Sequence, residues 1–253
     1  NMLDQLKQRS GNKLNWKDFS NEVTNERVTK SENEINIIEE TISISDKAFN
    51  SVSKKISEGM TEKEIAWEIE KEIRNLGAES LSFDTIVASG LNGSKPHHSP
   101  TDKKIKENEA ITIDMGAKYK GYCSDLTRTI FIGAPNDKFK KIYNIVLRSQ
   151  LIAIETAREK MTGEEIDKIS RDIISKENFG ENFGHSLGHG VGLEVHENPG
   201  VGPNSKNKIM SGMIYTVEPG IYIDGWGGIR IEDMVLMTDN GNKLLSHAEK
   251  ESY

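Results

Sequence analysis

A six-residue pattern occurs twice in this 253-residue chain and limits the fold more than any other feature. Residues 60–65, MTEKEI, recur as residues 161–166, MTGEEI, at an offset of 101 positions. Each copy follows a long helical pattern and precedes strand-forming segments. The T-x-x-E core is also a common capping sequence, so chance similarity remains an alternative. An order of helix, helix and strands that appears twice favours one α+β domain built from two similar halves, with a site in the cleft between them.

Capping signals and residue composition locate the elements. Ser31 and Thr61 each stand three positions before a glutamate and form capping boxes at two helix starts. The second of these helices ends at Gly77, and a further long helix covers roughly residues 135–160. Residues 82–89 have the composition of a strand. The sequence therefore predicts helices of similar kind in both halves.

The ordered domain is predicted to span residues 31–253. Residues 1–30 are polar and weakly periodic, and we interpret them as a linker or as the remnant of a missing N-terminal domain. With 35% apolar and 29% charged residues, the chain is typical of a soluble globular protein. Its single cysteine, Cys123, excludes an intrachain disulfide and fits a reducing cytoplasm.

Charge and hydropathy exclude two classes of partner. The net charge is −7 and the chain has no long run of Lys or Arg, which disfavours binding to nucleic acid. No apolar run reaches the length of a membrane span, so we predict no membrane insertion.

Acidic residues form a first pair on a predicted hairpin. Residues 110–116 have the pattern of a strand, and residues 122–132 have that of the returning strand, with the turn near residues 119–120. Asp114 and Asp125 are equally far from that turn, so we predict that they face each other directly. Cross-strand side chains are roughly 5 Å apart, and like charges there are destabilising.

A second acidic pair is predicted in the same way, from equal distances in sequence to the centre of a turn. Glu218 and Glu232 are equidistant from Gly225 in a glycine-rich turn. His189 stands between Gly188 and Gly190, which let the backbone approach closely and leave the imidazole unobstructed. Two pairs of facing carboxylates and one imidazole indicate divalent cations between them. Such an oxygen-rich set admits Mn²⁺, Co²⁺, Fe²⁺ or Zn²⁺ and disfavours thiolate-type sites. The sequence therefore predicts a two-metal hydrolase.

Four segments carry a resemblance to a known family. They are residues 114–129 (DMGAKYKGYCSDLTRT), 184–197 (GHSLGHGVGLEVHE), 216–222 (TVEPGIY) and 228–233 (GIRIED). In this order they resemble the motifs of proline-specific metallopeptidases, the Xaa-Pro aminopeptidases and Xaa-Pro dipeptidases (prolidases). The resemblance spans about residues 25–250. Its motifs are long, ordered and specific.

The resemblance implies the pseudo-symmetric pita-bread fold and a catalytic domain. It implies that two divalent ions, manganese first among them, are held by Asp114, Asp125, His189, Glu218 and Glu232. A hydroxide that bridges the ions would attack the bond between an N-terminal residue and a following proline, with Glu218 as general base. The implied partners are short peptides with proline second, and a second copy of the chain through the missing N-terminal region.

Three histidines receive roles from the resemblance, and Arg230 receives one because it stands two residues before Glu232 on the same face of a strand. His97 faces the substrate, while its neighbour His98 is interpreted as solvated. His185 and His196 stabilise the tetrahedral intermediate or carry a proton to the leaving nitrogen. Arg230 fixes carboxylate geometry or binds a substrate carboxylate, with a simple ion pair to an acid such as Asp233 as the alternative.

Three alternatives stay open at this stage. Methionine aminopeptidase shares the fold and the five ligands, but its last motif typically lacks an arginine two places before the final glutamate. Non-enzymatic pita-bread binding modules, and creatine hydrolysis without metals, are disfavoured because this chain keeps all five ligands. The catalytic half alone does not separate an aminopeptidase from a dipeptidase.

Overall fold

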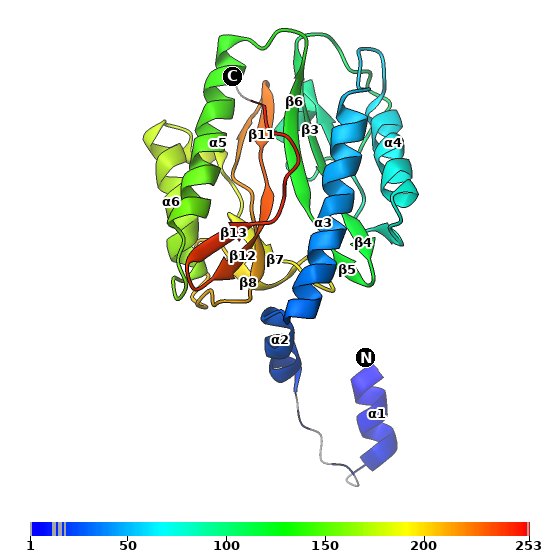
Figure 1. Cartoon of the computed structure of the whole chain (residues 1–253), viewed down its shortest axis with the longest axis vertical. Coiled ribbons are helices and arrows are strands. Elements are labelled where there is room, and N and C mark those ends of the chain that lie inside the picture. The colour runs from blue at the N-terminus through cyan, green and yellow to red at the C-terminus, as the bar shows by residue number, and fades with distance from the viewer. Residues whose placement is uncertain (1, 12–13, 15–16, 18, 252) are drawn as a thin grey trace.

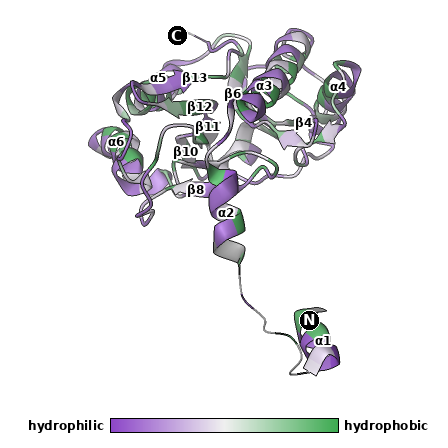
Figure 2. Ribbon diagram, turned by 60° about the horizontal axis from the view of Figure 1, so that its bottom comes forward, coloured by the Kyte–Doolittle hydropathy of each residue, from purple (hydrophilic) through white to green (hydrophobic). Residues whose placement is uncertain are grey.

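The computed structural model describes residues 2–11, 14, 17, 19–251 and 253. Two groups of helices flank antiparallel sheets, as Figure 1 shows. The first group consists of α3 (Glu32–Ser53) and α4 (Glu62–Asn75), and the second of α5 (Asp137–Thr156) and α6 (Gly163–Lys176). Figure 2 views the same arrangement from another side, with helices of both groups around the strands. The predicted order of helix, helix and strands in each half is confirmed.

The helix starts follow the predicted capping chemistry. Ser31, Thr61 and Thr162 each accept a hydrogen bond from the backbone amide three residues on, and the glutamate carboxylate there accepts one from the backbone amide of the capping residue. All three are complete capping boxes. α5 begins one residue after its cap, Asn136, and is shorter than the predicted span of residues 135–160.

The strands of the first half form two small sheets. One has the order β2 (Ile86–Ser89), β3 (Glu109–Met115) and β6 (Leu126–Ile132), and the other the order β1 (Ser80–Leu81), β4 (Ala117–Tyr119) and β5 (Tyr122–Cys123). The predicted strand over residues 82–89 is only partly right. Its first residues bend out of the sheet, where Ser82 Oγ donates to the carbonyl of Ser124 (2.8 Å) and its amide to that of Gly116 (3.0 Å).

The second half contains the largest sheet and a hairpin. The five-stranded sheet has the order β13 (Gly241–Leu244), β12 (Asp233–Thr238), β9 (Ile214–Val217), β7 (Gly188–Gly190) and β8 (Glu197–Val201). The hairpin pairs β10 (Gly220–Ile223) with β11 (Gly227–Arg230). The domain also contains two 3-10 turns, η2 (Gly90–Ser94) and η3 (Gly180–Asn182).

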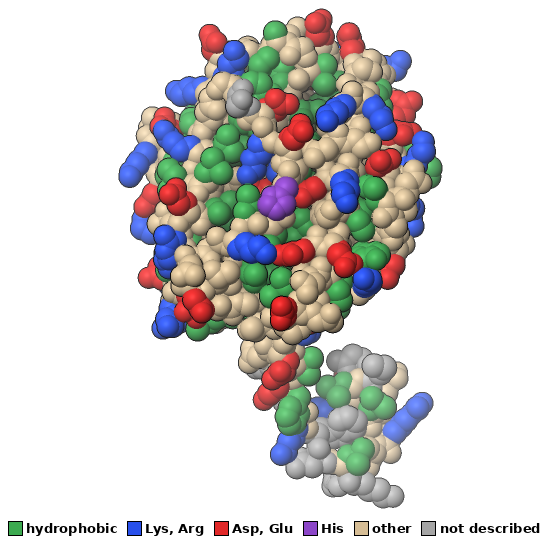
Figure 3. Space-filling model, viewed as in Figure 1, with side chains coloured by type: hydrophobic (Ala, Val, Ile, Leu, Met, Phe, Trp, Pro, Cys, Tyr) green, Lys and Arg blue, Asp and Glu red, His purple; other side chains and the backbone are tan. Residues whose placement is uncertain are grey.

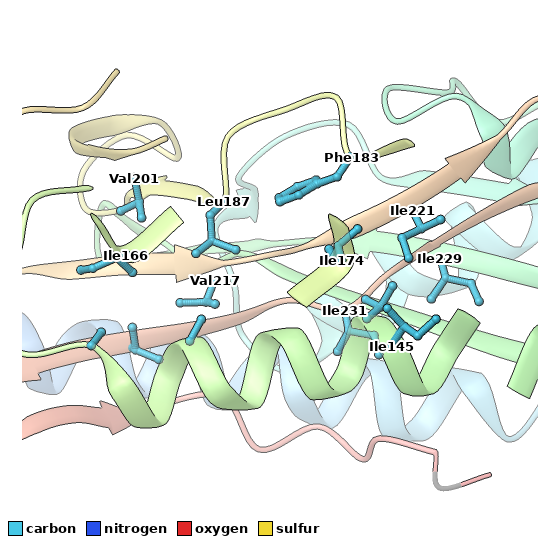
Figure 4. Packing of buried hydrophobic residues seen from close by; sticks show 14 of the residues in the cluster. Ile145, Ile166, Ile174, Phe183, Leu187, Val201, Val217, Ile221, Ile229 and Ile231 are labelled. Carbon is cyan, nitrogen blue, oxygen red and sulfur yellow. The ribbon is translucent and has the colours of Figure 1, made fainter. Parts of the chain in front are cut away.

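Each half has its own buried core. In the second half, Ile145 on α5 lies beside Ile229 and Ile231 near the strands, as Figure 4 shows. In the first half, Ile65 and Ile69 of α4 pack in a separate cluster with residues of α3 and the strands. Burial of these side chains stabilises the sheets from which the site residues project, at roughly 25 cal/mol per Å² of apolar surface.

The N-terminal segment, predicted as a linker, contains two helices, α1 (Met2–Ser10) and α2 (Ser20–Val28). Acidic and basic side chains are interspersed on the face shown in Figure 3. Across the described residues, none of the helices combines the length and the apolar character needed to cross a membrane.

Candidate active site

One cavity of about 520 Å³ contains every residue that the sequence predicts for the site. Both halves of the domain contribute to it. The predicted residues on its wall are His97, Asp114, Asp125, His185, His189, His196, Glu218, Arg230 and Glu232. Phe83 and Ile86 add apolar surface to the same wall. The fold therefore brings together positions that are spread over more than half of the sequence.

The first acidic pair is not in the predicted register. β3 and β6 place Asp114 opposite Thr127, and not opposite Asp125. Asp125 precedes β6 in a break between β5 and β6, where its backbone amide lies 3.2 Å from the sulfur of Met234. The predicted direct opposition of the two aspartates is therefore wrong, although both line the cavity.

The turn of this hairpin explains the error. Tyr119 pairs with Tyr122, so the turn consists of Lys120 and Gly121. Both have positive φ, 49° and 83°, as a two-residue hairpin turn requires. The predicted turn lies one residue too early, and this shifts the expected pairing by two positions. A shift of two preserves the face on which each side chain lies.

The second acidic pair lies where the sequence predicts it. The ladder between β9 and β12 ends with Val217 opposite Asp233, and the ladder between β10 and β11 continues in the same register. Glu218 and Glu232 occupy matching positions in the gap between the two ladders. The backbone amide of Glu232 donates to the carbonyl of Thr127 (3.0 Å), which joins this pair to the first hairpin.

His189 sits on β7 in very close packing. A side chain at position 188 would lie 1.9 Å from the carbonyl oxygen of Thr216, and one at position 190 would lie 2.1 Å from that of Asn198. Only glycine fits at Gly188 and Gly190, as expected for a backbone that approaches its neighbours closely.

The ring of His189 is oriented toward the carboxylates. Its Nδ1 lies 3.1 Å from the carbonyl oxygen of Gly190, which can only accept, so Nδ1 carries the proton of this bond. Nε2 lies 3.3 Å from Glu218 Oε1 and 3.6 Å from Asp125 Oδ2. The imidazole therefore presents Nε2 to any cation among these oxygens.

Burial and mutual repulsion make the ionised form of most carboxylates in the site unfavourable. Burial raises the pKa of Asp114, Asp125 and Glu232, and the negative charges of neighbouring carboxylates raise it further. Burial also acts on Glu218, but the hydrogen bond and charge of His189 outweigh it and lower the pKa of that carboxyl. A cation among these groups would offset the repulsion that otherwise protonates them.

The donor set fits a metal ion. Asp125, His189 and Glu232 each offer one ligand atom, and these atoms lie within 4.8 Å of one another. Within the described part of the chain, the buried Oδ1 of Asp114 has no hydrogen-bond partner, which is unusual for a carboxylate oxygen. Carboxylate oxygens with one imidazole suit divalent first-row metals.

Arg230 is fully engaged with site residues. Nη2 contacts Asp114 Oδ2 at 2.7 Å, Nη1 donates to the hydroxyl of Tyr222 at 2.8 Å, and Nε donates to Thr127 Oγ1 at 3.1 Å. The alternative of an ion pair with Asp233 is wrong. Asp233 instead accepts from Arg128 (2.8 Å), which is buried beside it.

The substrate-facing histidines differ in their surroundings. His185 Nε2 is hydrogen bonded to the Tyr222 hydroxyl at 2.9 Å, and burial lowers the pKa of its ring. The ring centroid of His196 lies 4.1 Å from that of His189, and burial followed by the nearby His189 lowers its pKa. His97 joins them on the cavity wall.

Three residues that support the site are absent from the sequence-based set. Thr127 Oγ1 donates to Glu232 Oε2 (2.7 Å), and Thr216 Oγ1 donates to Glu218 Oε1 (3.0 Å). Tyr222 bridges His185 and Arg230. The two threonines could be predicted from the sequence, because each stands two residues from an acidic site residue and residues so spaced lie on the same face of a strand.

The prediction of a solvated His98 is wrong. Its side chain is buried, and Nε2 lies 2.9 Å from Oε2 of Glu62, a carboxylate that is itself fully buried. The partner lies 36 residues earlier in the chain, so nothing in the local sequence of the loop reveals it.

Two similar halves, with a buried cluster of carboxylates and an imidazole in a shared cavity, define a metallopeptidase with the pita-bread fold. The chain belongs to metallopeptidase family M24, whose model matches residues 36–239.

The comparisons show similarity to proteins described as proline-specific. The chain is 45% identical over 249 residues to an Xaa-Pro dipeptidase of Pyrococcus horikoshii, which covers 98% of this chain and 71% of the relative. It superposes on the crystal structure of a prolidase from that organism with a TM-score of 0.96 at 45% identity, covering 100% of this chain and 72% of the other.

An X-Pro aminopeptidase from Thermotoga maritima matches with a TM-score of 0.90 at 42% identity, over 92% of this chain and 66% of that structure. The chain spans about two thirds of the length of these relatives.

Proposed function

We propose that this chain is the catalytic domain of a proline-specific exopeptidase, an Xaa-Pro dipeptidase or Xaa-Pro aminopeptidase. One observation carries the proposal: residues from all four sequence motifs line a single cavity, and three of them place ligand atoms within 4.8 Å of one another. The identity to relatives named for this activity supports it.

The proposed metal ligands are Asp114, Asp125, His189, Glu218 and Glu232, and manganese is the first ion to test. Two divalent ions at these residues would lower the pKa of a water molecule and polarise the scissile carbonyl. The raised pKa values of three of the carboxylates support this assignment, because an empty cluster of this kind is electrostatically unfavourable.

Glu218 is the proposed general base. It is the one carboxyl of the cluster whose pKa is lowered, so it is available to accept a proton from the attacking water. His196 has a lowered pKa and is neutral near pH 7, so it can donate a hydrogen bond to the anionic intermediate. His185 also has a lowered pKa, but its Nδ1 donates to the carbonyl of Ser186 (2.8 Å), so its Nε2 accepts from the Tyr222 hydroxyl and its proposed role is to orient that hydroxyl. Arg230 holds Asp114 in position through its ion pair.

Proline specificity has a physical basis in this cavity. The imide nitrogen of an Xaa-Pro bond has no proton, so no acceptor is needed for it. Phe83 and Ile86 offer apolar surface on the wall to the proline ring. Arg230, two places before Glu232, favours the proline-specific enzymes over methionine aminopeptidase. Dimer formation and a cytoplasmic location remain predictions.

Hydrolysis of three peptides tests the proposed specificity. The chain, reconstituted with Mn²⁺, Co²⁺ or Zn²⁺, is assayed on Ala-Pro, Ala-Pro-Ala and Met-Ala-Ser. We expect cleavage before proline only, and the ratio of dipeptide to tripeptide rates separates a dipeptidase from an aminopeptidase. Cleavage of Met-Ala-Ser alone would favour a methionine aminopeptidase instead.

A further inference from the structure

Glu62, at the first turn of α4, is a fully buried carboxylate outside the cavity. Six donors contact its two oxygens. They are the amide and hydroxyl of Ser89 (2.9 and 2.7 Å), Asn92 Nδ2 (3.0 Å), His98 Nε2 (2.9 Å), and the amide and hydroxyl of Thr101 (3.0 and 2.7 Å). Burial alone would raise the pKa of Glu62, but these hydrogen bonds outweigh it and lower the pKa to about 2. The ionised carboxylate only accepts, so His98 donates from Nε2.

The internal repeat shows that the helix itself does not require this carboxylate. The position equivalent to Glu62 in the second copy is Gly163, yet Thr162 completes the same capping box there. A side chain at position 163 would lie 2.2 Å from the carbonyl of Gly200. The two helix starts therefore share the capping box, but the first has a buried carboxylate at a position where the second has a closely packed glycine.

All donors to Glu62 belong to residues 89–101, which start at the last residue of β2 and include η2. This connection, called the loop below, also enters the active site. Pro96 and His97 line the cavity, and the carbonyl of Pro96 accepts from Arg230 Nη1 (3.3 Å). His98, the next residue, points instead to Glu62. Adjacent residues of the loop therefore contact the site on one side and the buried carboxylate on the other.

We infer that Glu62 and His98 form a clamp that positions His97 for catalysis. The inference rests on the proposed peptidase function. Glu62 does not line the cavity and is a positioning residue that acts through His97. Its six hydrogen bonds anchor both ends of the loop and its middle, so the backbone that carries His97 has little freedom. Misplacement of a catalytic group by about 1 Å costs roughly 100-fold in rate.

The test is a double-mutant cycle on the metal-loaded protein. E62Q places an amide against the donors of Thr101 and His98, and we expect kcat/KM for Ala-Pro to fall about 100-fold with metal content unchanged. In the H97A background, E62Q should lower kcat/KM by no more than about twofold. An equal loss from E62Q with and without His97, or no loss at all, would overturn the inference.

Two further variants test whether the loss of activity in E62Q comes from the clamp or from a change at the helix start. H98A removes one of the six donors, and we expect it to lower kcat/KM for Ala-Pro by about tenfold. This loss should vanish in the H97A background. A loss of the same size in the H97A background would contradict the clamp. E64Q is the matched control, because Glu64 stands on the same helix turn, is exposed, and its carboxylate accepts hydrogen bonds from the amide and hydroxyl of Thr61. It should keep wild-type kinetics; a loss as large as that of E62Q would assign the effect to the helix start and refute the clamp.

A second readout does not depend on activity. Hydrogen–deuterium exchange of residues 89–101 in the metal-free chain should rise in E62Q and stay unchanged in E64Q. Unaltered exchange in E62Q would contradict the clamp. If the wild-type chain hydrolyses no proline peptide, the proposed function fails, while the exchange data still decide whether Glu62 holds the loop.

Discussion

Arg230 Nη2 lies 2.7 Å from Asp114 Oδ2, while Oδ1 of the same carboxylate is buried and, among the described residues, accepts no hydrogen bond. The guanidinium thus fixes one oxygen and leaves the other for a different partner. Thr127 and Tyr222 hold the guanidinium in turn. In the proposed peptidase, the other oxygen of Asp114 would be available to hold a metal ion, and Arg230 would set the orientation of this carboxylate.

Substitution of Arg230 should therefore weaken both metal binding and activity. We expect R230A to lower metal affinity and kcat about 10- to 100-fold, the usual cost of removing a group that orients a metal ligand. R230K should recover little, because an ammonium does not reproduce the fork that contacts Asp114, Thr127 and Tyr222 at once. Arg74, an exposed arginine paired with Glu70, gives the control variant R74A, which should match the wild type. Unchanged metal affinity in R230A would refute this role.

Removal of a proposed ligand should abolish both properties. We expect D125A and E232A to lose bound metal and to reduce Ala-Pro hydrolysis to the level of the chelated protein, because each removes an oxygen from the cluster. Metal per chain, measured by atomic emission, checks this beside the assay. D102A alters an exposed aspartate paired with Lys63 and serves as the control. Normal metal content with near-normal activity in D125A would exclude the ligand assignment.

The metal-free protein should become more stable when one carboxylate is neutralised. Burial, then the charges of Glu232 and Asp114, raise the pKa of Asp125 well above 3.8. We expect D125N to raise the free energy of unfolding of the chelated chain at neutral pH by on the order of 1 kcal/mol. Urea unfolding in chelator measures this. A destabilised D125N would show that the cluster is not strained without metal.

The same linkage predicts the pH dependence of the chelated wild type. The folded chain keeps protons on Asp125 and Glu232 at a pH where the unfolded chain, with ordinary values of 3.8 and 4.5, has released them. These two groups therefore add stability as the pH falls from neutral toward that range, and the addition is lost as the pH rises through the folded values. The stability difference between D125N and the wild type should accordingly shrink as the pH falls. A constant difference between pH 7 and pH 5 would contradict the raised pKa of Asp125.

His196 should act on turnover rather than on metal binding. It lines the cavity, and its ring centroid lies 4.1 Å from that of His189 with the two rings tilted by 45°, but it does not belong to the closest set of ligand atoms. We expect H196A to lower kcat for Ala-Pro about 100-fold and to keep its metal content. H247A alters a histidine outside the cavity and controls for the loss of an imidazole. Wild-type kinetics in H196A would make His196 a structural residue.

Local chemistry explains which elements could be predicted from the sequence. The capping boxes at Ser31, Thr61 and Thr162 depend on residues three positions apart, so their signal is contained in the sequence. The pairing of Glu218 with Glu232 was accessible for a similar reason, because the glycine-rich turn between them sets the register of both strands.

The errors have a common physical origin in partners distant in sequence or in turn geometry. The predicted register of the Asp114 hairpin is wrong because the turn consists of Lys120 and Gly121, both with positive φ, and not of Tyr119 and Lys120. His98 is predicted to be solvated because its partner, Glu62, lies 36 residues away in the sequence. Arg230 contacts a site carboxylate, as one of its predicted roles requires, but its partner is Asp114, 116 residues away, and not the nearby Asp233. No local pattern marks such contacts.

The central claim is that this cluster binds the ions on which proline-peptide hydrolysis depends. Titration of the chelated chain with Mn²⁺, with bound metal and Ala-Pro hydrolysis measured on the same samples, tests it most directly. We expect activity to rise with occupancy and to saturate at about two ions per chain, the number expected of a two-metal site. Hydrolysis that is equally fast in the chelated protein, or saturation with metal without any hydrolysis, would contradict the account.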